Sequence, residues 1–72
     1  MTCAICGGEA SEPLDITENV HEMLCAGDMR AWRESPGFAL AEQLVDLGKL
    51  AEAIQQYRDF TARREREIRR AA

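Results

Sequence analysis

The spacing of three cysteines constrains this chain more than any other feature of its sequence. Cys3 and Cys6 are separated by two residues, and Cys25 follows later. Because a chain of 72 residues buries too little apolar surface to outweigh its conformational entropy comfortably, it needs a cross-link. An odd number of cysteines cannot pair fully into disulfides, and the sequence contains no secretory signal pattern. We therefore expect a cytoplasmic protein that a metal ion stabilises.

The N-terminal segment Cys3-Ala4-Ile5-Cys6-Gly7-Gly8 has the form of a zinc knuckle. Two thiolates at this spacing grip one metal ion because the chain folds back tightly between them, and the glycines allow backbone conformations with positive φ. Thioredoxin-like redox sites share the spacing, but they precede a helix in a larger βα fold that this chain does not provide. The pattern predicts a structural zinc ion bound by Cys3, Cys6 and Cys25.

Structural zinc takes four ligands, so one more residue must complete the site. His21 would complete a finger of the form C-x2-C-x14-H-x3-C if the segment before Cys25 were helical. Asp28 would instead close a second knuckle with Cys25. The polar and apolar alternation over Val20–Leu24 predicts a strand, which would separate His21 from Cys25 by about 13 Å. We therefore favour Asp28 and keep His21 as the alternative ligand.

A nearby cation would help to offset the charge of such a site. Three thiolates and a carboxylate around a divalent zinc ion would leave a net charge of about −2. Two arginines follow the second knuckle closely, at Arg30 and Arg33. We expect one of them to offset the negative charge of the site.

The first part of the chain resembles a known class of zinc module. Cys3-x2-Cys6-Gly7 followed by Val20-His21-x2-Leu24-Cys25-x2-Asp28 is similar to the small treble-clef units of McsA-type and ClpX-type bacterial protein-quality-control proteins. Those units carry C-x2-C-G and then L-C-x2-C, so Asp28 stands where they have a cysteine. The resemblance implies a treble clef with a short β-hairpin and an adaptor function through protein contacts.

The second part of the chain, residues 35–72, has a helical pattern. Ser35 and Pro36 are favoured at the cap and the first position of a helix, so a new helix is expected there. Apolar residues recur at helical spacing on both sides of Gly48, which either lies within one long helix or ends the first helix of a hairpin. We expect a zinc-binding module over 1–34 and a helical region over 35–72, packed as one small domain.

Two further patterns concern the helical region. The string Leu47-Gly48-x-Leu50-x-x-Ala53-Ile54-x-x-Tyr57 resembles the turn and second helix of a tetratricopeptide repeat. Since solenoid repeats need about three units and this chain has one, the resemblance implies a helical hairpin. A heptad stripe would also allow self-association, through Leu40, Leu47, Ile54, Thr61 and Ile68. The large side chains expected to join both parts in a core are Trp32, Phe38, Leu40, Tyr57 and Phe60.

The distribution of charge limits the possible partners. A formal charge of −4 argues against general attraction to nucleic acid, but the C-terminal end of the chain is rich in arginine. Arg63, Arg66 and Arg70 would share one face of a helix and could contact phosphates or an acidic partner. Arginine outnumbers lysine, which favours a GC-rich bacterial or phage origin.

The sequence offers no sign of catalysis. It contains no carboxylate pair, nucleophile motif or phosphate loop, and four protein ligands would close the zinc ion to a catalytic water. No apolar run approaches the roughly 20 residues that span a bilayer. The sequence therefore predicts a small zinc-stabilised α+β protein that is not an enzyme. It would act as an adaptor or regulator by binding a protein or a second copy of itself, and the alternative is a small nucleic-acid-binding regulator.

Overall fold

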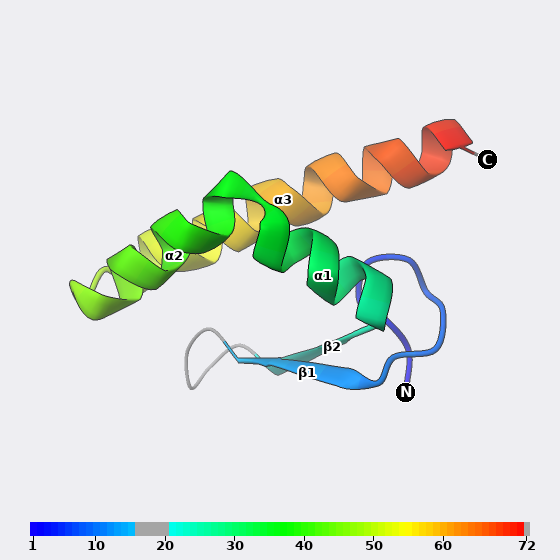
Figure 1. Ribbon diagram of the computed structural model, residues 1–72, viewed down its shortest axis with the longest axis horizontal. Coiled ribbons are helices and arrows are strands. Elements are labelled where there is room, and N and C mark those ends of the chain that lie inside the picture. The colour runs from blue at the N-terminus through cyan, green and yellow to red at the C-terminus, as the bar shows by residue number, and fades with distance from the viewer. Residues whose placement is uncertain (16–20, 72) are drawn as a thin grey trace.

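The fold is a small α+β arrangement of a two-stranded antiparallel sheet and three helices, as predicted. The computed structural model describes residues 1–15 and 21–71, without the side chains at the two inner ends of the strands, Asp15 and His21. The elements are β1 (Glu12–Asp15), β2 (His21–Leu24), α1 (Ala26–Glu34), α2 (Pro36–Asp46) and α3 (Leu50–Ala71). The sheet lies below the helices in Figure 1, and α3 runs along the longest axis of the molecule.

The two strands present one face to the helices. Leu14 lies opposite Glu22, and Leu24 lies opposite Glu12, so these side chains share a face of the antiparallel pair. Leu14 and Leu24 are buried in the core. The alternation predicted for this segment is confirmed by β2, while Val20 lies outside the described residues. A one-residue shift of register would turn both leucines to solvent.

The joint between α1 and α2 is the predicted Ser35-Pro36 step. The backbone N–H of Ser35 and its hydroxyl both donate to the carbonyl oxygen of Trp32, at 3.1 and 2.7 Å. Ser35 is extended, with φ −76° and ψ 149°, which ends α1 and lets Pro36 open α2 at the position that proline favours. The predicted start of a new helix is confirmed.

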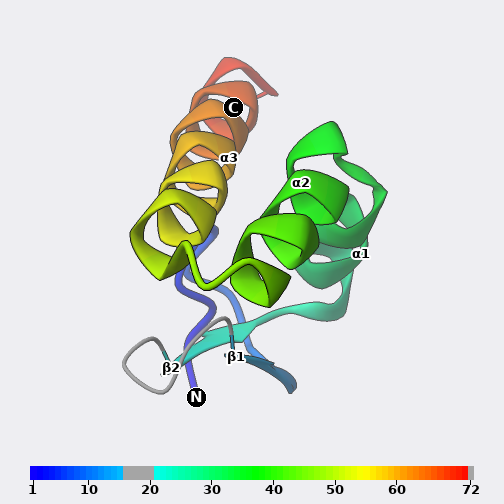
Figure 2. The same cartoon turned by 90° about the vertical axis from the view of Figure 1, so that its left-hand side faces the viewer.

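A left-handed glycine separates α2 from α3 and makes the helical region a hairpin instead of one long helix. Gly48 has φ +76°, the conformation that glycine adopts without steric cost. The N–H of Lys49 donates to the carbonyl of Leu44 at 2.8 Å, and the N–H of Gly48 donates to that of Val45 at 3.0 Å. This pair of bonds is a Schellman cap. Figure 2 shows the two helices of the hairpin side by side.

Trp32 is the centre of the core that joins the helices. Its ring packs edge-on against Phe38 and Tyr57, with centroids 5.6 and 5.4 Å apart, and lies 5.3 Å from the ring of Phe60. Trp32 and Tyr57 are almost fully buried, and the two phenylalanines pack against the core. The core prediction holds for these four aromatic residues. It is wrong for Leu40, which is 43% exposed and lies at the open groove between α2 and α3.

Glu22 ties α3 to the sheet. The Tyr57 hydroxyl donates to one oxygen of the Glu22 carboxylate at 2.6 Å, and Arg58 Nη1 donates to the other at 2.8 Å. Burial and the carboxylate of Glu22 raise the pKa of Tyr57 well above its ordinary value. Although α3 has 22 residues, none of the described helices combines the length and apolar character that crossing a membrane requires.

Substitution of Gly48 tests the hairpin turn. An alanine there must keep a left-handed backbone, so Gly48→Ala should lower the free energy of unfolding by about 1–2 kcal/mol. Gly27→Ala is the matched control, because a Cβ at this helical glycine meets open space, and it should be neutral or stabilising by up to about 1 kcal/mol. Urea denaturation measures both variants. Equal stability of the two variants would contradict the turn described above.

Alkaline titration tests the buried contact of Tyr57, the one tyrosine of the chain. Its folded-state pKa is raised above the unfolded value of about 10, so this contribution to stability is complete below pH 10. It should be lost progressively as the pH rises above 10, because the unfolded chain ionises first. Phenolate absorbance should therefore appear at a higher pH in the native protein than in urea. Coincident titration curves would contradict the burial of the phenol.

Candidate metal centre

The first pair of ligands lies in the N-terminal loop. Gly7 has φ +78°, and its N–H donates to the carbonyl of Cys3 at 3.1 Å, which folds the chain back between the cysteines. The N–H of Gly8 points at the sulfur of Cys6, 3.4 Å away. This geometry is what a metal-binding knuckle requires.

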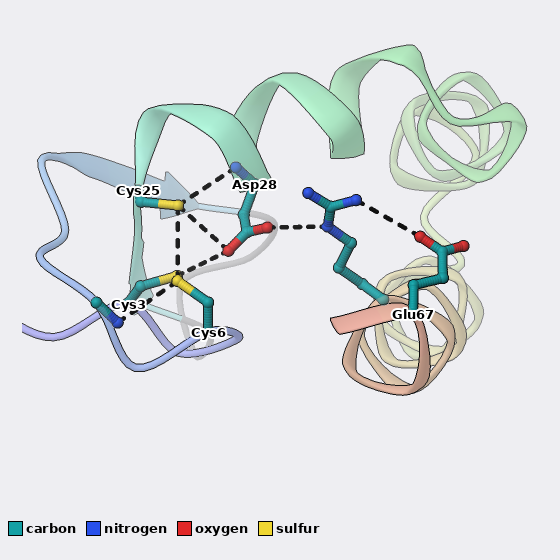
Figure 3. Close-up of polar contacts among 7 residues, drawn as sticks. Cys3, Cys6, Cys25, Asp28 and Glu67 are labelled. Carbon is teal, nitrogen blue, oxygen red and sulfur yellow. Dashed lines mark hydrogen bonds and ion pairs between the residues drawn. The ribbon is translucent and has the colours of Figure 1, made fainter. Parts of the chain in front are cut away.

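The second pair of ligands lies at the start of α1. Cys25 caps the helix, and its sulfur accepts from the N–H of Asp28 at 3.4 Å. The Asp28 carboxylate is thereby directed back over the first turn toward the cysteines (Figure 3). Because β2 leads directly into Cys25, the β-hairpin determines the position of Cys25 and Asp28.

Backbone hydrogen bonds bring the two pairs together. The N–H of Ala4 donates to the carbonyl of Met23 at 2.9 Å, which holds the N-terminal loop against β2. On the other side of the loop, the N–H of Ser11 donates to the carbonyl of Leu24 at 3.2 Å. The loop is thus attached to the strand that ends at the second pair of ligands.

One atom from each of Cys3, Cys6, Cys25 and Asp28 lies within 4.8 Å of all the others. The sulfurs of Cys6 and Cys25 are 3.8 Å apart, and Asp28 Oδ2 is 3.2 Å from the sulfurs of Cys3 and Cys25. A tetrahedral ion with bonds of about 2.3 Å to sulfur would separate two sulfurs by about 3.8 Å. All three cysteines are free thiols. These four residues could bind a metal ion.

The alternative ligand His21 starts β2, and its side chain lies outside the described residues. The extended course of β2 separates its backbone from that of Cys25 by about 13 Å. Asp28 already directs an oxygen to the sulfurs of the cluster. The structure therefore brings together the four residues favoured from the sequence.

Arg64 is the cation beside the cluster. Its Nε donates to Asp28 Oδ1 at 3.0 Å, and the side chain of Asp28 is only 3% exposed. Arg30 and Arg33, which were expected to help offset the charge, are exposed on α1, whereas the described ion pair with Asp28 comes from Arg64 on α3. In the sequence Arg64 follows Tyr57 by seven residues, so the two share a face of the helix. A polar residue on the face that contains the buried Tyr57 was the available signal.

The ionisation of the ligands depends on their neighbours. Burial opposes ionisation of Asp28, but the hydrogen bonds from Arg64 and the thiols outweigh it and hold its pKa below the ordinary value. Burial also opposes ionisation of Cys3, but backbone N–H groups, that of Cys6 foremost, lower its pKa. The N–H of Gly8 favours the Cys6 thiolate, yet the neighbouring Cys3 and Asp28 raise its pKa to about 11. A bound cation would remove this mutual repulsion and allow all four groups to ionise.

Burial also differs between the ligands. Cys3 and Asp28 are buried, Cys25 is half-buried and Cys6 is exposed. An ion would therefore enter the cluster from the side of Cys6.

The arginines predicted to contact a partner lie apart from these ligands. Arg63, Arg66 and Arg70 are exposed on α3, and the Nε of Arg66 donates to the carbonyl of Ala62 at 3.4 Å. Only Arg64 of this arginine-rich segment turns toward the cluster among the described contacts. No protein-family model, curated protein or solved structure matches this chain.

Paired alanine variants test the ligand set. Asp28→Ala should weaken metal binding by at least about 100-fold, since it removes a donor and not merely an outer partner. His21→Ala is the control and should bind metal like the unchanged protein. Titration with Co²⁺ under reducing conditions reports binding through thiolate charge-transfer absorption. Weakening by His21→Ala alone would show that histidine completes the site.

Proposed function

We propose that this protein is a non-enzymatic zinc-binding adaptor, in which zinc is structural and the helical hairpin contacts a partner. The observation that carries the proposal is the cluster of Cys3, Cys6, Cys25 and Asp28. Four protein donors fill the tetrahedral shell of zinc and leave no position for a reacting water. Such a site stabilises a fold instead of performing chemistry.

The donor set supports zinc over Mg²⁺ and Ca²⁺. Three thiolates are soft ligands that suit Zn²⁺, whereas Mg²⁺ and Ca²⁺ prefer shells of oxygen. The 3.8 Å between the sulfurs of Cys6 and Cys25 fits tetrahedral geometry. A small chain also gains most from such an ion, because binding free energy becomes folding free energy.

The order of the elements supports a treble clef. A knuckle precedes the hairpin of β1 and β2, and the second pair of ligands begins α1. This is the order that the resemblance to McsA-type and ClpX-type modules implies. Asp28 in place of a cysteine distinguishes this chain from them. An adaptor function by analogy with those modules is part of the proposal.

The partner surface in this proposal is an apolar patch on the hairpin, formed by Leu40, Leu47 and Leu50. These leucines are 43%, 70% and 44% exposed, and only Met1 joins them among the large exposed hydrophobic residues of the described chain. Lys49 and Glu52, of opposite charge, are exposed at the same end of the hairpin. A second copy packed in antiparallel orientation could therefore pair these charges while burying the leucines. We propose a homodimer through this patch.

Metal removal tests the structural role of zinc. The purified protein should contain one zinc ion per chain, and a chelator should lower its melting temperature by 10 °C or more, since a loss of about 2 kcal/mol shifts so small a domain by this amount. Circular dichroism measures the transition with and without chelator. A chain that lacks zinc and melts identically under both conditions would contradict the proposal.

Light scattering at two concentrations tests the partner surface. Leu47→Glu places a charge in the patch and should convert a dimer into a monomer. Ala62→Glu adds the same charge at an exposed position of α3 outside the patch and should leave the dimer intact. A monomer at both concentrations would rule out the second copy as partner.

The second candidate function is nucleic-acid binding through α3. The observation that favours it is the exposure of Arg63, Arg66 and Arg70 near the end of the helix. Phosphate contacts would make affinity fall steeply with salt. The affinity for duplex DNA at low salt should be measured for the unchanged protein and for a variant with all three arginines replaced by glutamine. If both proteins bind DNA weakly and with equal affinity, this candidate is excluded.

A further inference from the structure

The Asp28 carboxylate connects the metal cluster to the last helix. One oxygen, Oδ2, lies 3.2 Å from the sulfurs of Cys3 and Cys25, while the other, Oδ1, accepts from Arg64 Nε at 3.0 Å. Figure 3 shows Asp28 between the thiols on one side and α3 on the other. One oxygen of the buried carboxylate therefore contacts the ligand cluster, and the other contacts α3. Asp28 and Arg64 are 36 residues apart in the sequence.

Arg64 is itself held in place for this contact. Its Nη1 lies 3.5 Å from an oxygen of Glu67, one turn later on the same helix. The guanidinium thus lies between the buried Asp28 and the exposed Glu67, with a third of its side chain exposed. A fork of N–H donors that spans two carboxylates limits how the end of α3 can lie on the cluster.

Few other contacts hold the C-terminal part of α3. Tyr57 and Arg58 bind Glu22, and Phe60 packs on Trp32, all in the first half of the helix. Beyond Phe60, the described ties to the rest of the molecule are the Arg64–Asp28 pair and the partly buried Ile68. In Figure 1 these last turns extend beyond the other two helices. Their docking therefore depends strongly on the position of the Asp28 carboxylate.

Metal binding and the contact with Arg64 would use different oxygens of Asp28. Oδ1 accepts from Arg64 Nε while Oδ2 lies against the sulfurs of Cys3 and Cys25, so both interactions require the same orientation of the carboxylate. An ion bound through Oδ2 would hold the carboxylate in the orientation that Arg64 contacts. The end of α3 would therefore be held more firmly when the ion is bound.

We infer that Arg64 positions Asp28 for metal binding, and that metal binding in turn docks the C-terminal end of α3 onto the zinc module. The inference rests on the proposed zinc site and adds a coupling between that site and the arginine-bearing helix. Because such coupling is reciprocal, whatever Arg64 contributes to zinc affinity, zinc contributes to docking of the helix end. Zinc loading would thereby determine how Arg63, Arg66 and Arg70 are presented to solvent.

Zinc affinity of matched variants is the first part of the test. Arg64→Gln removes the cation and should weaken zinc binding by about 10–100-fold, as loss of an outer partner of a ligand does. Arg63→Gln makes the same charge change at the neighbouring exposed position and should remain within about 2-fold of the unchanged protein. Arg64→Lys keeps the charge without the fork and should be intermediate. Competition with a chromophoric chelator measures all three, and circular dichroism verifies that each is folded.

Amide hydrogen exchange of residues 61–71 is the second part. Zinc should slow exchange in this segment of the unchanged protein and of Arg63→Gln, and the effect should disappear in Arg64→Gln. If Arg64→Gln fails to fold, Arg64→Lys is compared with Arg63→Gln instead, and the effect of zinc on exchange should be smaller in Arg64→Lys.

Two outcomes would overturn the inference. Equal zinc affinities of Arg64→Gln and Arg63→Gln, or exchange in residues 61–71 that zinc leaves unchanged, would remove the coupling while leaving the proposed zinc site in place. Failure of the unchanged protein to bind zinc would instead overturn the proposed function, and the coupling with it. The failures of the two proposals are thus distinguishable.

Discussion

The buried carboxylate of Asp28 is the constraint on which the arrangement of this protein depends. An ionised carboxylate with a side chain only 3% exposed is costly unless charge and hydrogen bonds compensate it. Compensation comes from Arg64 on α3 and from thiols contributed by both knuckles. The N-terminal loop, the start of α1 and the far half of α3 therefore meet at one side chain.

The two parts of the chain achieve stability by different means. The helical region packs aromatic side chains around Trp32, and Tyr57 reaches from there to the sheet through Glu22. Around the N-terminal loop the buried apolar side chains are few, namely Cys3, Ile5 and Ala10, and the four possible metal ligands lie beside them. A metal ion is well suited to such a region, because it replaces many weak contacts by four strong bonds. The proposed zinc and the aromatic core would thus complement each other.

Much of the backbone could be predicted because its signals are local. The knuckle spacing, the alternation of β2, the Ser35-Pro36 step and the glycine after α2 each act within a few residues. Gly48 left two interpretations open, since a glycine both weakens a helix and ends one. The Schellman bonds around it decide for the hairpin.

The contacts that join the parts could not be predicted in the same way. Arg64 and Asp28 are 36 residues apart in the sequence, and Tyr57 and Glu22 are 35 residues apart. Contacts over such separations leave no local pattern in the sequence. Arg30 and Arg33 were the nearer cations in the sequence, but the helical direction of α1 leaves them exposed. Leu40 likewise belongs to an apolar stripe, yet it is 43% exposed at the open groove between α2 and α3. Tertiary packing selects among side chains that local spacing treats alike.

X-ray absorption spectroscopy of the zinc-loaded protein tests the central claim most directly, because it counts the donor atoms around the ion. Three thiolates and one carboxylate predict three sulfurs at about 2.3 Å and one oxygen at about 2.0 Å. Asp28→Cys should convert this shell to four sulfurs. A shell with fewer than three sulfurs, or one unchanged by Asp28→Cys, would contradict the account of Cys3, Cys6, Cys25 and Asp28 as a closed zinc site.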